Sequence, residues 1–193
     1  MSDNKTQYHK NETAQSRRLP VRIRLATAAD MAAMIPVVNA AFAIETFLEG
    51  TRTDEERTAE MMRKGEFLLA EEIVTKKITD GVAKDSAVVN GTGRIVAAVY
   101  TELRGERGYF GMLSVDPSRQ GTGLGRVMVE AAEDYCRKHG CKHVDIVVLS
   151  LRPDLPPFYR KLGYIQTGTE AARTSRPLKD GLECHGITMS KVL

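Results

Sequence analysis

The sequence lacks tryptophan, has three cysteines among its 193 residues, and has no long uninterrupted apolar run. Three cysteines are too few for a disulfide framework, and an odd number is typical of free thiols in a reducing compartment. No apolar run approaches the ~18 residues that a membrane-spanning helix needs. The net charge of +3 is also too small to indicate nucleic-acid binding by itself. We therefore expect a cytoplasmic protein whose partners are neither membranes nor nucleic acids.

The remaining composition is typical of a folded globular domain. Apolar residues make up 42% and charged residues 27% of the chain, which excludes a mostly disordered or collagen-like protein. Residues 1–18 differ, because they contain only three apolar residues and show no periodicity. No apolar segment of the kind found in signal peptides follows them. We predict a flexible polar tail over residues 1–18 and a single domain over residues 19–193.

Hydrophobic periodicity predicts a mixed α/β fold. Strands are expected at residues 21–25, 67–70, 95–103, 109–115, 144–149, 164–169 and 186–192, and helices at residues 27–42, 53–65, 124–139 and 156–163. Thr27 and Thr53 are the predicted N-caps of the first two helices. Residues 72–86 are predicted to form a connecting insertion, and residues 87–103 a hairpin with its turn at residues 90–93.

Two of the predicted strands have further consequences. The apolar run at residues 144–149 is continuous, which indicates a strand that is buried on both faces. The C-terminal strand, residues 186–192, offers an edge for pairing with a second copy of the chain, which would give a homodimer.

The predicted helix at residues 124–139 has the clearest pattern in the chain. Its apolar residues form one stripe: Leu124, Val127, Met128, Ala131, Ala132 and Tyr135. A glycine-rich run, Gly121 to Gly125, opens this helix directly after a predicted strand. Unpaired N–H groups at a helix N-terminus attract anions, and glycines let a ligand approach the backbone closely. Arg119 and Arg126 add positive charge, so the run predicts a phosphate or pyrophosphate site.

Two familiar phosphate motifs do not match this run. A nucleotide-hydrolysing P-loop requires Lys and then Ser or Thr after its last glycine, but Arg126 and Val127 follow Gly125 here. The dinucleotide-binding fingerprint requires a third glycine where Arg126 stands. A glycine-rich turn that holds no ligand is also an alternative at this point.

Three segments together resemble the GNAT superfamily of N-acetyltransferases. Gln120 to Gly125 has that family's Gln/Arg-x-x-Gly-x-Gly/Ala pattern, and Met112 to Pro117 resembles its central strand. Phe158 to Tyr164 resembles its second signature, Phe/Leu-Tyr-x-x-Leu-Gly-Phe/Tyr. The resemblance is specific over residues 95–170 and looser over residues 21–65. It implies an α/β fold with a mixed, mostly antiparallel sheet, a splayed central parallel strand pair and helices on both faces.

The resemblance also implies acetyl-CoA as co-substrate and an amine, of a small molecule or of a protein, as acceptor. Acetyl-CoA would lie between the strands at residues 109–115 and 143–149, with its pantetheine arm bonded to the backbone of Leu113 and Val115. Its pyrophosphate would bind the backbone N–H groups of Gln120, Gly121, Thr122, Gly123, Leu124, Gly125 and Arg126. Tyr159 matches the family tyrosine that acts as general acid. A phenol, with a pKa near ~10, can donate a proton at neutral pH.

Two positions depart from the family pattern. Tyr109 stands where some members carry the glutamate that acts as general base, and Arg152 replaces an asparagine that contacts pantetheine. By residue type alone, Glu45, Glu102 and Glu106 are candidate bases, although a solvated surface carboxylate is the ordinary interpretation of each. Removal of the proton by water and a neutral incoming amine are the alternatives.

The first helices and last strands shape the acceptor site in this family. Phe42, Glu45, Phe47 and Tyr109 are therefore the residues expected to line it. Two other functions stay open as alternatives. One is a non-catalytic acyl-CoA sensor or interaction module, and the other is an acyltransferase with a different acyl donor or a hydroxyl acceptor.

No metal is expected. Cys136, His139, Cys141 and His143 have a spacing that suggests zinc ligands. However, the usual structural zinc sites separate two ligand pairs by a longer loop.

Overall fold

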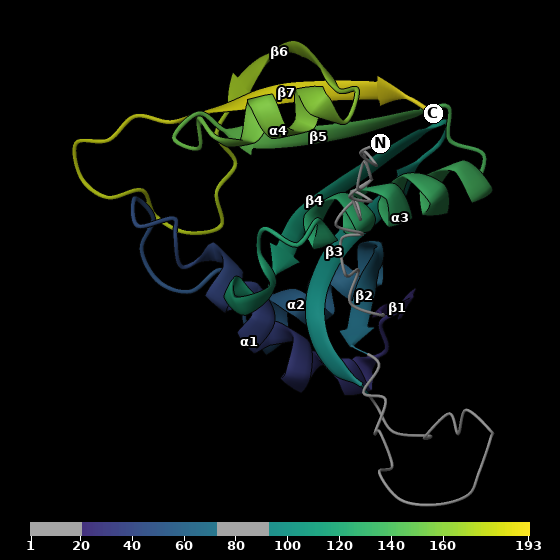
Figure 1. Ribbon diagram of the computed structural model, residues 1–193. Coiled ribbons are helices and arrows are strands. Elements are labelled where there is room, and N and C mark those ends of the chain that lie inside the picture. Colours follow the sequence, from purple (N-terminus) through teal and green to yellow (C-terminus); the bar gives the residue numbers. More distant parts are fainter. Residues whose placement is uncertain (1–20, 73–92) are drawn as a thin grey trace, which may run out of the picture.

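The computed structural model describes residues 21–72 and 93–193. Within them, seven strands form one sheet in the order β1-β2-β3-β4-β5-β7-β6 (Figure 1). The strands are β1 (Val21–Leu25), β2 (Glu66–Glu72), β3 (Arg94–Arg104), β4 (Arg107–Val115), β5 (His143–Leu149), β6 (Ile165–Ala171) and β7 (His185–Val192). Every neighbouring pair is antiparallel except β4 and β5, which are parallel. The predicted α/β class and mostly antiparallel sheet are confirmed.

Some predictions concern parts of the chain that the structure does not describe. The predicted tail and the predicted hairpin turn, apart from Gly93, lie outside the described residues. The predicted insertion also lies outside them, apart from Glu72, which is the last residue of β2. The second strand of the predicted hairpin is β3, which pairs with β2 on one side and with β4 on the other.

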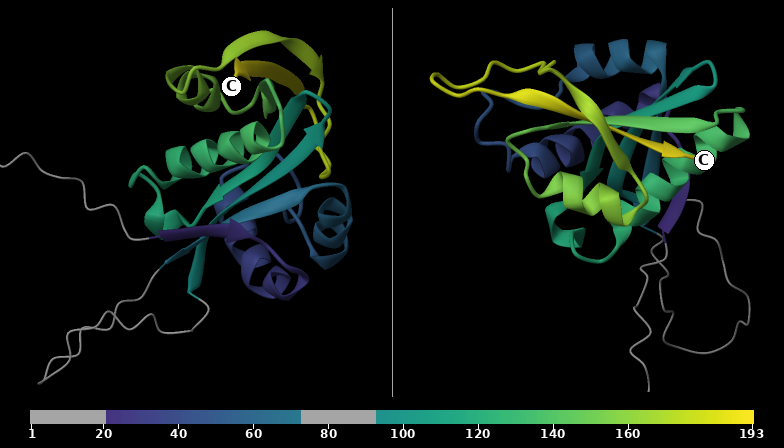
Figure 2. Two further views of the ribbon diagram at one scale, coloured as in Figure 1. Left: turned by 90° about the vertical axis from the view of Figure 1, so that its right-hand side faces the viewer. Right: turned by 90° about the horizontal axis from the view of Figure 1, so that it is seen from above.

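Helices cover both faces of the sheet (Figure 2). The helices are α1 (Met31–Phe42), α2 (Glu55–Lys64), α3 (Leu124–Lys138) and α4 (Leu155–Lys161), with short 3₁₀ turns η1 (Ala28–Asp30) before α1 and η2 (Pro117–Arg119) before α3. α1 and α2 pack on one face, whereas α3 and α4 pack on the other. β2 and β3 lie between these layers, so most of their residues are buried. None of the helices in the described ranges is long and apolar enough to cross a membrane.

The first two helices begin close to the predicted positions. The backbone N–H of Thr27 donates to the Asp30 carboxylate at 2.7 Å, as expected of an N-terminal cap, but a 3₁₀ turn precedes α1. The cap predicted at Thr53 is wrong by one residue. Asp54 caps α2 by accepting from the backbone N–H of Arg57 at 2.8 Å. The N–H of Thr53 donates to the Asn39 side chain instead, which ties α1 to the start of α2.

Two predictions about the C-terminal half are wrong. β5 is not buried on both faces, because its residues alternate between buried and half-buried. α1 and α2 pack against β2, β3 and β4, whereas β5 lies beyond them in the sheet. β7 offers no edge to a second copy, because β5 pairs with one of its edges and β6 with the other. The homodimer itself stays a prediction, but β7 cannot be the strand through which two copies pair.

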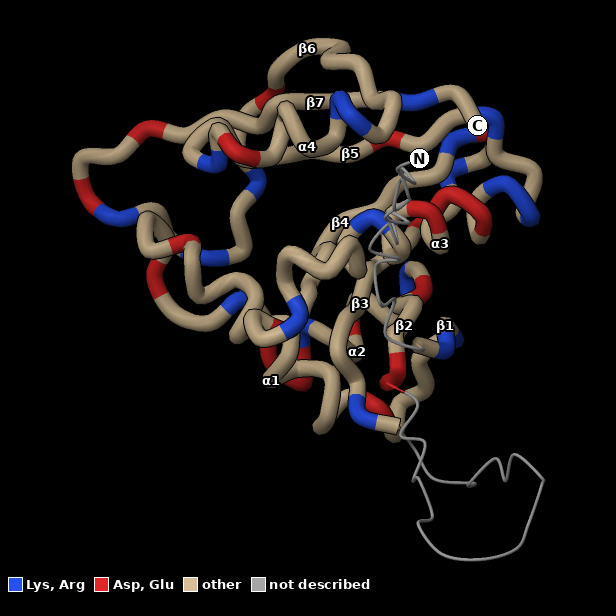
Figure 3. The backbone as a smooth tube through the Cα atoms, in the orientation of Figure 1, with Lys and Arg blue, Asp and Glu red and all other residues tan. Residues whose placement is uncertain are grey.

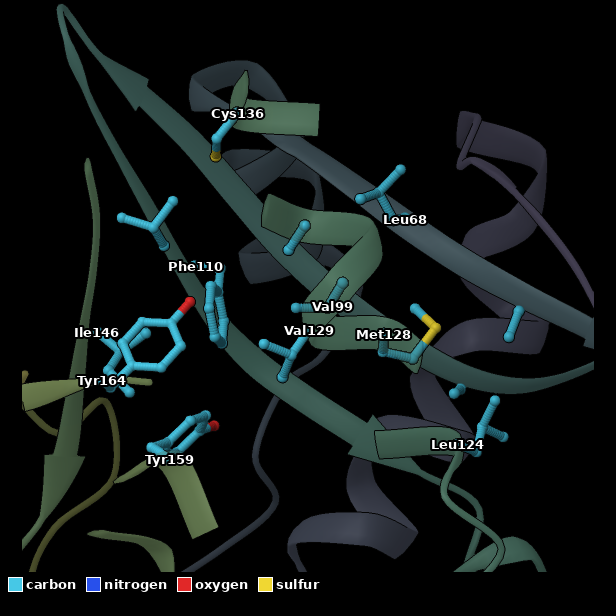
Figure 4. Close-up of a cluster of buried hydrophobic side chains, with 14 of the residues drawn as sticks. Leu68, Val99, Phe110, Leu124, Met128, Val129, Cys136, Ile146, Tyr159 and Tyr164 are labelled. Atoms are coloured by element: carbon cyan, nitrogen blue, oxygen red, sulfur yellow. The ribbon is translucent and has the colours of Figure 1, made fainter. Parts of the chain in front are cut away.

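α3 packs on the sheet through a face that is rotated from the predicted stripe (Figure 4). Its buried residues are Leu124, Met128, Val129, Ala132, Glu133 and Cys136, while Val127, Ala131 and Tyr135 of the predicted stripe are only partly buried. The sequence pattern failed at Glu133, whose charge suggests exposure. Its carboxylate accepts from the Tyr164 hydroxyl at 2.9 Å and from Lys191 Nζ at 2.7 Å, which compensates for its burial.

β4 and α3 approach each other most tightly at Gly108. A Cβ atom on Gly108 would lie 2.4 Å from Cys136 Sγ and 2.9 Å from Cys136 Cβ. Gly108→Ala is therefore expected to push α3 from the sheet and to destabilise the protein by about 2 kcal/mol. Thermal unfolding should show this as a fall of about 4–8 °C in melting temperature. The double variant Gly108→Ala/Cys136→Ala should recover part of the loss, and an unchanged melting temperature in Gly108→Ala would contradict this packing.

Candidate active site

The parallel strands β4 and β5 stay together over a short distance. The paired residues are Arg107 with His143, Gly108 with Val144, and Tyr109 with Asp145. Beyond them the strands diverge (Figure 1), and β4 from Phe110 to Val115 has no strand partner on that side within the described residues. The predicted splay is confirmed. It leaves backbone donors and acceptors on the inner edge of β4 open to a ligand.

A β-bulge in β4 accompanies this divergence. Towards β3, Gly111 pairs with Tyr100 and Ser114 with Ala98, so β4 has one extra residue between these two pairs. Met112, inside the bulge, has a φ of 54°, a left-handed conformation that costs about 1–3 kcal/mol in a non-glycine residue. The Ser114 hydroxyl donates to the carbonyl of Met112 at 2.8 Å. Because bulges bend the strand that contains them, this one turns β4 at the point where the ligand edge begins.

A cavity of about 610 Å³ lies between the diverging strands. Of the residues predicted from the sequence, its walls contain Phe42, Glu45, Tyr109, Leu113, Val115, Gln120 and Tyr159. The structure therefore brings three of the predicted acceptor residues, the predicted acid and part of the predicted acetyl-CoA site to one cavity, whereas Phe47 is not among the lining residues. Gly121 to Arg126 follow Gln120 directly and lie beside the cavity, at the N-terminus of α3.

The glycine-rich loop presents a row of backbone N–H groups. Gly121 and Gly123 have φ angles of 75° and 87°, in the left-handed region that glycine tolerates best. The first hydrogen bond of α3 runs from the Val127 N–H to the Gly123 carbonyl, at 3.2 Å. In the part of the chain that the structure describes, the N–H groups from Gly121 to Arg126 have no protein acceptor. Such N–H groups, together with the positive end of a helix dipole, are of the kind that bind a pyrophosphate-like anion, so the prediction of an anion site here stays open to test. Leu124 contributes only its N–H, because its side chain is buried.

Tyr159, the predicted acid, lies on α4 at the wall of the cavity and is 5% exposed. Its ring packs against Phe110 and Tyr164 at centroid distances of 6.0 and 5.7 Å (Figure 4). The ring of Phe158 lies at a centroid distance of 5.0 Å. Burial raises the pKa of the Tyr159 phenol well above its ordinary value, because the phenolate would be poorly solvated. The neighbouring Tyr164 hydroxyl is occupied by its bond to Glu133. Tyr159 therefore supplies a protonated hydroxyl at the cavity.

Glu45 is not the solvated surface carboxylate that its residue type suggested. It is 5% exposed, its carboxylate pairs with Arg176, and Arg152 Nη1 lies 3.6 Å from its Oε1. The backbone supports this arrangement, because the Glu49 N–H donates to the Pro177 carbonyl at 2.9 Å. The loop after α1 and the loop before β7 thus lie side by side (Figure 1), with charges of both signs along them (Figure 3). Residues of both loops line the part of the cavity where the acceptor is predicted to bind, which is called the acceptor end below.

The other candidate bases lie off the cavity. Glu102 binds Arg104 Nε at 2.9 Å, which lowers the pKa of that carboxyl, and it is not part of the cavity wall. Glu106 is exposed in the turn between β3 and β4 and pairs with Lys142. The carboxylates that do line the cavity are each paired with an arginine: Glu45, Asp154 and Glu170. The cavity wall, as far as it is described, therefore offers no unpaired carboxylate as a base.

Sequence reasoning missed two arginines of this cavity. Arg52 lies 4.6 Å above the ring of Phe42, and Arg104 lies 4.3 Å above the ring of Tyr109. Burial raises the pKa of the Tyr109 phenol, so Tyr109 does not replace the missing glutamate as a base near neutral pH. One sequence has no signal for these stacked pairs, because Arg52 and Phe42 come from different segments.

No group of three His, Cys, Asp or Glu side chains in the described ranges is placed to hold a metal ion. Cys136 and Cys141 are buried thiols, and burial raises the pKa of Cys136 to about 12. His139 lies at the end of α3, where its Nδ1 is 2.8 Å from the Tyr135 carbonyl.

The family of the protein follows from a comparison of its sequence with family models. The model of the acetyltransferase (GNAT) family matches residues 50–164, which is more than half of the chain. The chain therefore belongs to this family. The resemblance noted from the glycine-rich loop and the Phe158 to Tyr164 segment is confirmed.

Solved structures with the same fold include several acetyltransferases. The ribosomal-protein-S18-alanine N-acetyltransferase from Escherichia coli is 18% identical, with a TM-score of 0.66 over 90% of this chain and 94% of that chain. Ard1 from Thermoplasma volcanium is 16% identical, with a TM-score of 0.65 over 90% of this chain and 97% of that chain. The yncA protein from Salmonella typhimurium, solved with its cofactor acetyl-CoA, is 18% identical, with a TM-score of 0.62 over 90% and 94%. At these identities the likeness establishes the fold.

The glycine-rich loop can be tested with two matched substitutions. Gly123 and Gly140 both have a left-handed φ, of 87° and 83°, and a Cβ atom on either meets no other atom within 4 Å. Gly123→Ala and Gly140→Ala should therefore each lose about 1–2 kcal/mol of stability through backbone strain. Only Gly123→Ala should also weaken acetyl-CoA binding, by about tenfold or more in calorimetric titration, because it moves the N–H row. Equal affinity in both variants would contradict the assignment of the anion site.

Proposed function

We propose that this protein transfers an acetyl group from acetyl-CoA to a primary amine. The observation that supports this proposal most strongly is the meeting of three features at one cavity. The unpaired edge of β4 suits the donor, the protonated Tyr159 suits a leaving thiolate, and the loops after α1 and before β7 leave a place for the acceptor. Acyl transfer between two bound substrates depends on holding both together in this way.

The residues beside the cavity fit acetyl-CoA, which supplies an acetyl group as a thioester when it is bound. The N–H row from Gly121 to Arg126 suits its pyrophosphate. The backbone of Leu113 and Val115, on the edge of β4 without a strand partner, suits the amides of its pantetheine arm as an added strand. Arg152 binds Asp154 at 2.8 Å and belongs to the acceptor end, so it has no pantetheine contact in this proposal.

Tyr159 acts in this proposal as the general acid. The amine nitrogen attacks the thioester carbonyl carbon, the carbon–sulfur bond breaks, and the departing sulfur takes the proton of the Tyr159 hydroxyl. A backbone N–H on the inner edge of β4 stabilises the negative charge on the carbonyl oxygen. The phenolate regains its proton from solvent. No covalent bond between the protein and the acetyl group is needed.

The amine loses its proton without a carboxylate of the cavity wall. Glu45, Asp154 and Glu170 are all engaged with arginines. The amine therefore attacks in its neutral form, and its surplus proton leaves through water.

Substitution of Tyr159 tests the acid directly. Tyr159→Phe should lower kcat by about 100-fold or more, with acetyl-CoA affinity unchanged, because only the proton donor is lost. Tyr164→Phe is the matched control, since this second buried tyrosine lies 5.7 Å away and its hydroxyl bonds Glu133. It should lose stability but keep kcat. Thiol release from acetyl-CoA and calorimetric titration measure the two quantities.

An unchanged kcat in Tyr159→Phe would contradict the role of Tyr159. Wild-type protein that binds acetyl-CoA but acetylates no amine would support the non-catalytic sensor instead. A clear preference for another acyl-CoA, or for hydroxyl acceptors, would support an acyltransferase with a different acyl donor or a hydroxyl acceptor.

The pH dependence of kcat/KM tests whether the reaction proceeds without a carboxylate base on the protein. Because the neutral amine is the reactive form, kcat/KM should rise with pH up to the pKa of the acceptor amine itself. The raised pKa of Tyr159 keeps the acid protonated throughout this range. We therefore expect no fall in kcat/KM below about pH 10, the ordinary pKa of a phenol. The ascending limb of kcat/KM against pH should therefore lie at a different pH for two amines with different pKa values, and it should follow the pKa of each amine. An ascending limb at the same pH for both amines would reveal a base on the protein.

A further inference from the structure

The acceptor end of the cavity contains an arginine that makes no salt bridge with a carboxylate in the described residues, although the negative charge of Glu45 acts on it at longer range. Arg52 precedes α2 and lines both the main cavity and an adjoining hollow of about 220 Å³. Its guanidinium lies over the ring of Phe42, and its Nε is 2.9 Å from Met112 Sδ. These contacts occupy one of the five N–H donors of a guanidinium, so the others are available to a ligand.

The other cations at this end have partners. The pairs are Arg104 with Glu102, Arg152 with Asp154, Arg173 with Glu170, Arg176 with Glu45, and Lys64 with Glu60. Arg57, which also lines the hollow, donates to the Ser175 carbonyl. Arg57 thus also lacks a carboxylate partner in the described residues, but Arg52 differs from it because Arg52 lines the main cavity as well. It is half-buried, and burying a cation that always stays charged costs free energy unless an anion lies beside it.

The position of Arg52 shows which substrate such an anion would belong to. Its contact, Met112, is the bulge residue on β4 and directly precedes Leu113, where the pantetheine arm is proposed to bind. The pyrophosphate has its own site at the other end, from Gly121 to Arg126. An anion at Arg52 therefore lies beside the place of acetyl transfer and on the acceptor side of it.

We propose that Arg52 binds a carboxylate of the acceptor, and that the acceptor is accordingly a small amine that also has a carboxylate, such as an amino acid. The planar guanidinium matches a carboxylate through two parallel hydrogen bonds. A hollow of about 220 Å³ suits a small molecule of this kind. This inference rests on the proposed acetyl transfer and adds the class of amine.

Matched acceptor pairs test the inference. Tyrosine is compared with tyramine and histidine with histamine, since each pair differs only by the carboxylate. In the wild type, kcat/KM should favour the acid about tenfold or more, as expected for a hydrogen-bonded charge pair. Arg52→Gln should bring this ratio close to one, and Arg52→Lys, which keeps the charge but not the planar fork, should give an intermediate ratio. Arg107→Gln is the control, because Arg107 pairs with Asp145 and lines neither the cavity nor the hollow, and it should preserve the preference.

Three results would overturn the inference. They are equal kcat/KM for acid and amine in the wild type, a preference that survives Arg52→Gln in folded protein, and better turnover of peptides than of free amino acids.

A binding experiment covers the case in which no amine is acetylated and the proposed function fails separately. N-acetyl amino acids are then titrated into the complex of the protein with CoA. Binding about tenfold tighter to the wild type than to Arg52→Gln supports the site. Equal or undetectable binding overturns it.

Discussion

β4 and β5 can hydrogen-bond to each other only as far as Tyr109 and Asp145, and the geometry of the candidate site depends on their separation beyond that point. The bulge at Met112, held by the Ser114 hydroxyl, turns β4 where pairing stops. The separation leaves an edge of backbone groups and a cavity of about 610 Å³. α4 then brings Tyr159 to the wall of that cavity, so the proposed acid and the open edge of β4 border the same space.

In the proposed function, the two ends of the cavity would recognise ligands by different physical means. At the α3 end, backbone N–H groups and the helix dipole make up the proposed anion site, which requires glycine conformations rather than particular side chains. At the acceptor end, specificity depends on side chains from loops that are far apart in the chain. Glu45 and Arg176 join those loops, and Arg52 lines the same cavity without a salt bridge in the described residues. The first end fits a constant donor, whereas the second end can differ between members of one family.

Much of the fold could be predicted from the sequence, and so could the positions of the loop and tyrosine that the proposed donor half of the site uses, because their signals are local. The glycine run and the start of α3 lie within a few residues, and Tyr159 lies in a short motif. The errors involve contacts between distant segments. Glu133 is buried because Tyr164 and Lys191 reach it from other elements. β7 lies inside the sheet because β6 crosses to its outer edge, and Glu45 is buried because the β7-side loop covers it.

Hydrogen–deuterium exchange of the full chain tests the central claim most directly. Acetyl-CoA at saturation should slow exchange at the N–H groups of residues 121–126 and along the inner edge of β4, residues 110–115. Pantetheine alone should protect β4 but not the glycine loop, because it lacks the pyrophosphate. This result would place the donor between the diverging strands. Protection at neither segment, or protection confined to other parts of the chain, would contradict the account.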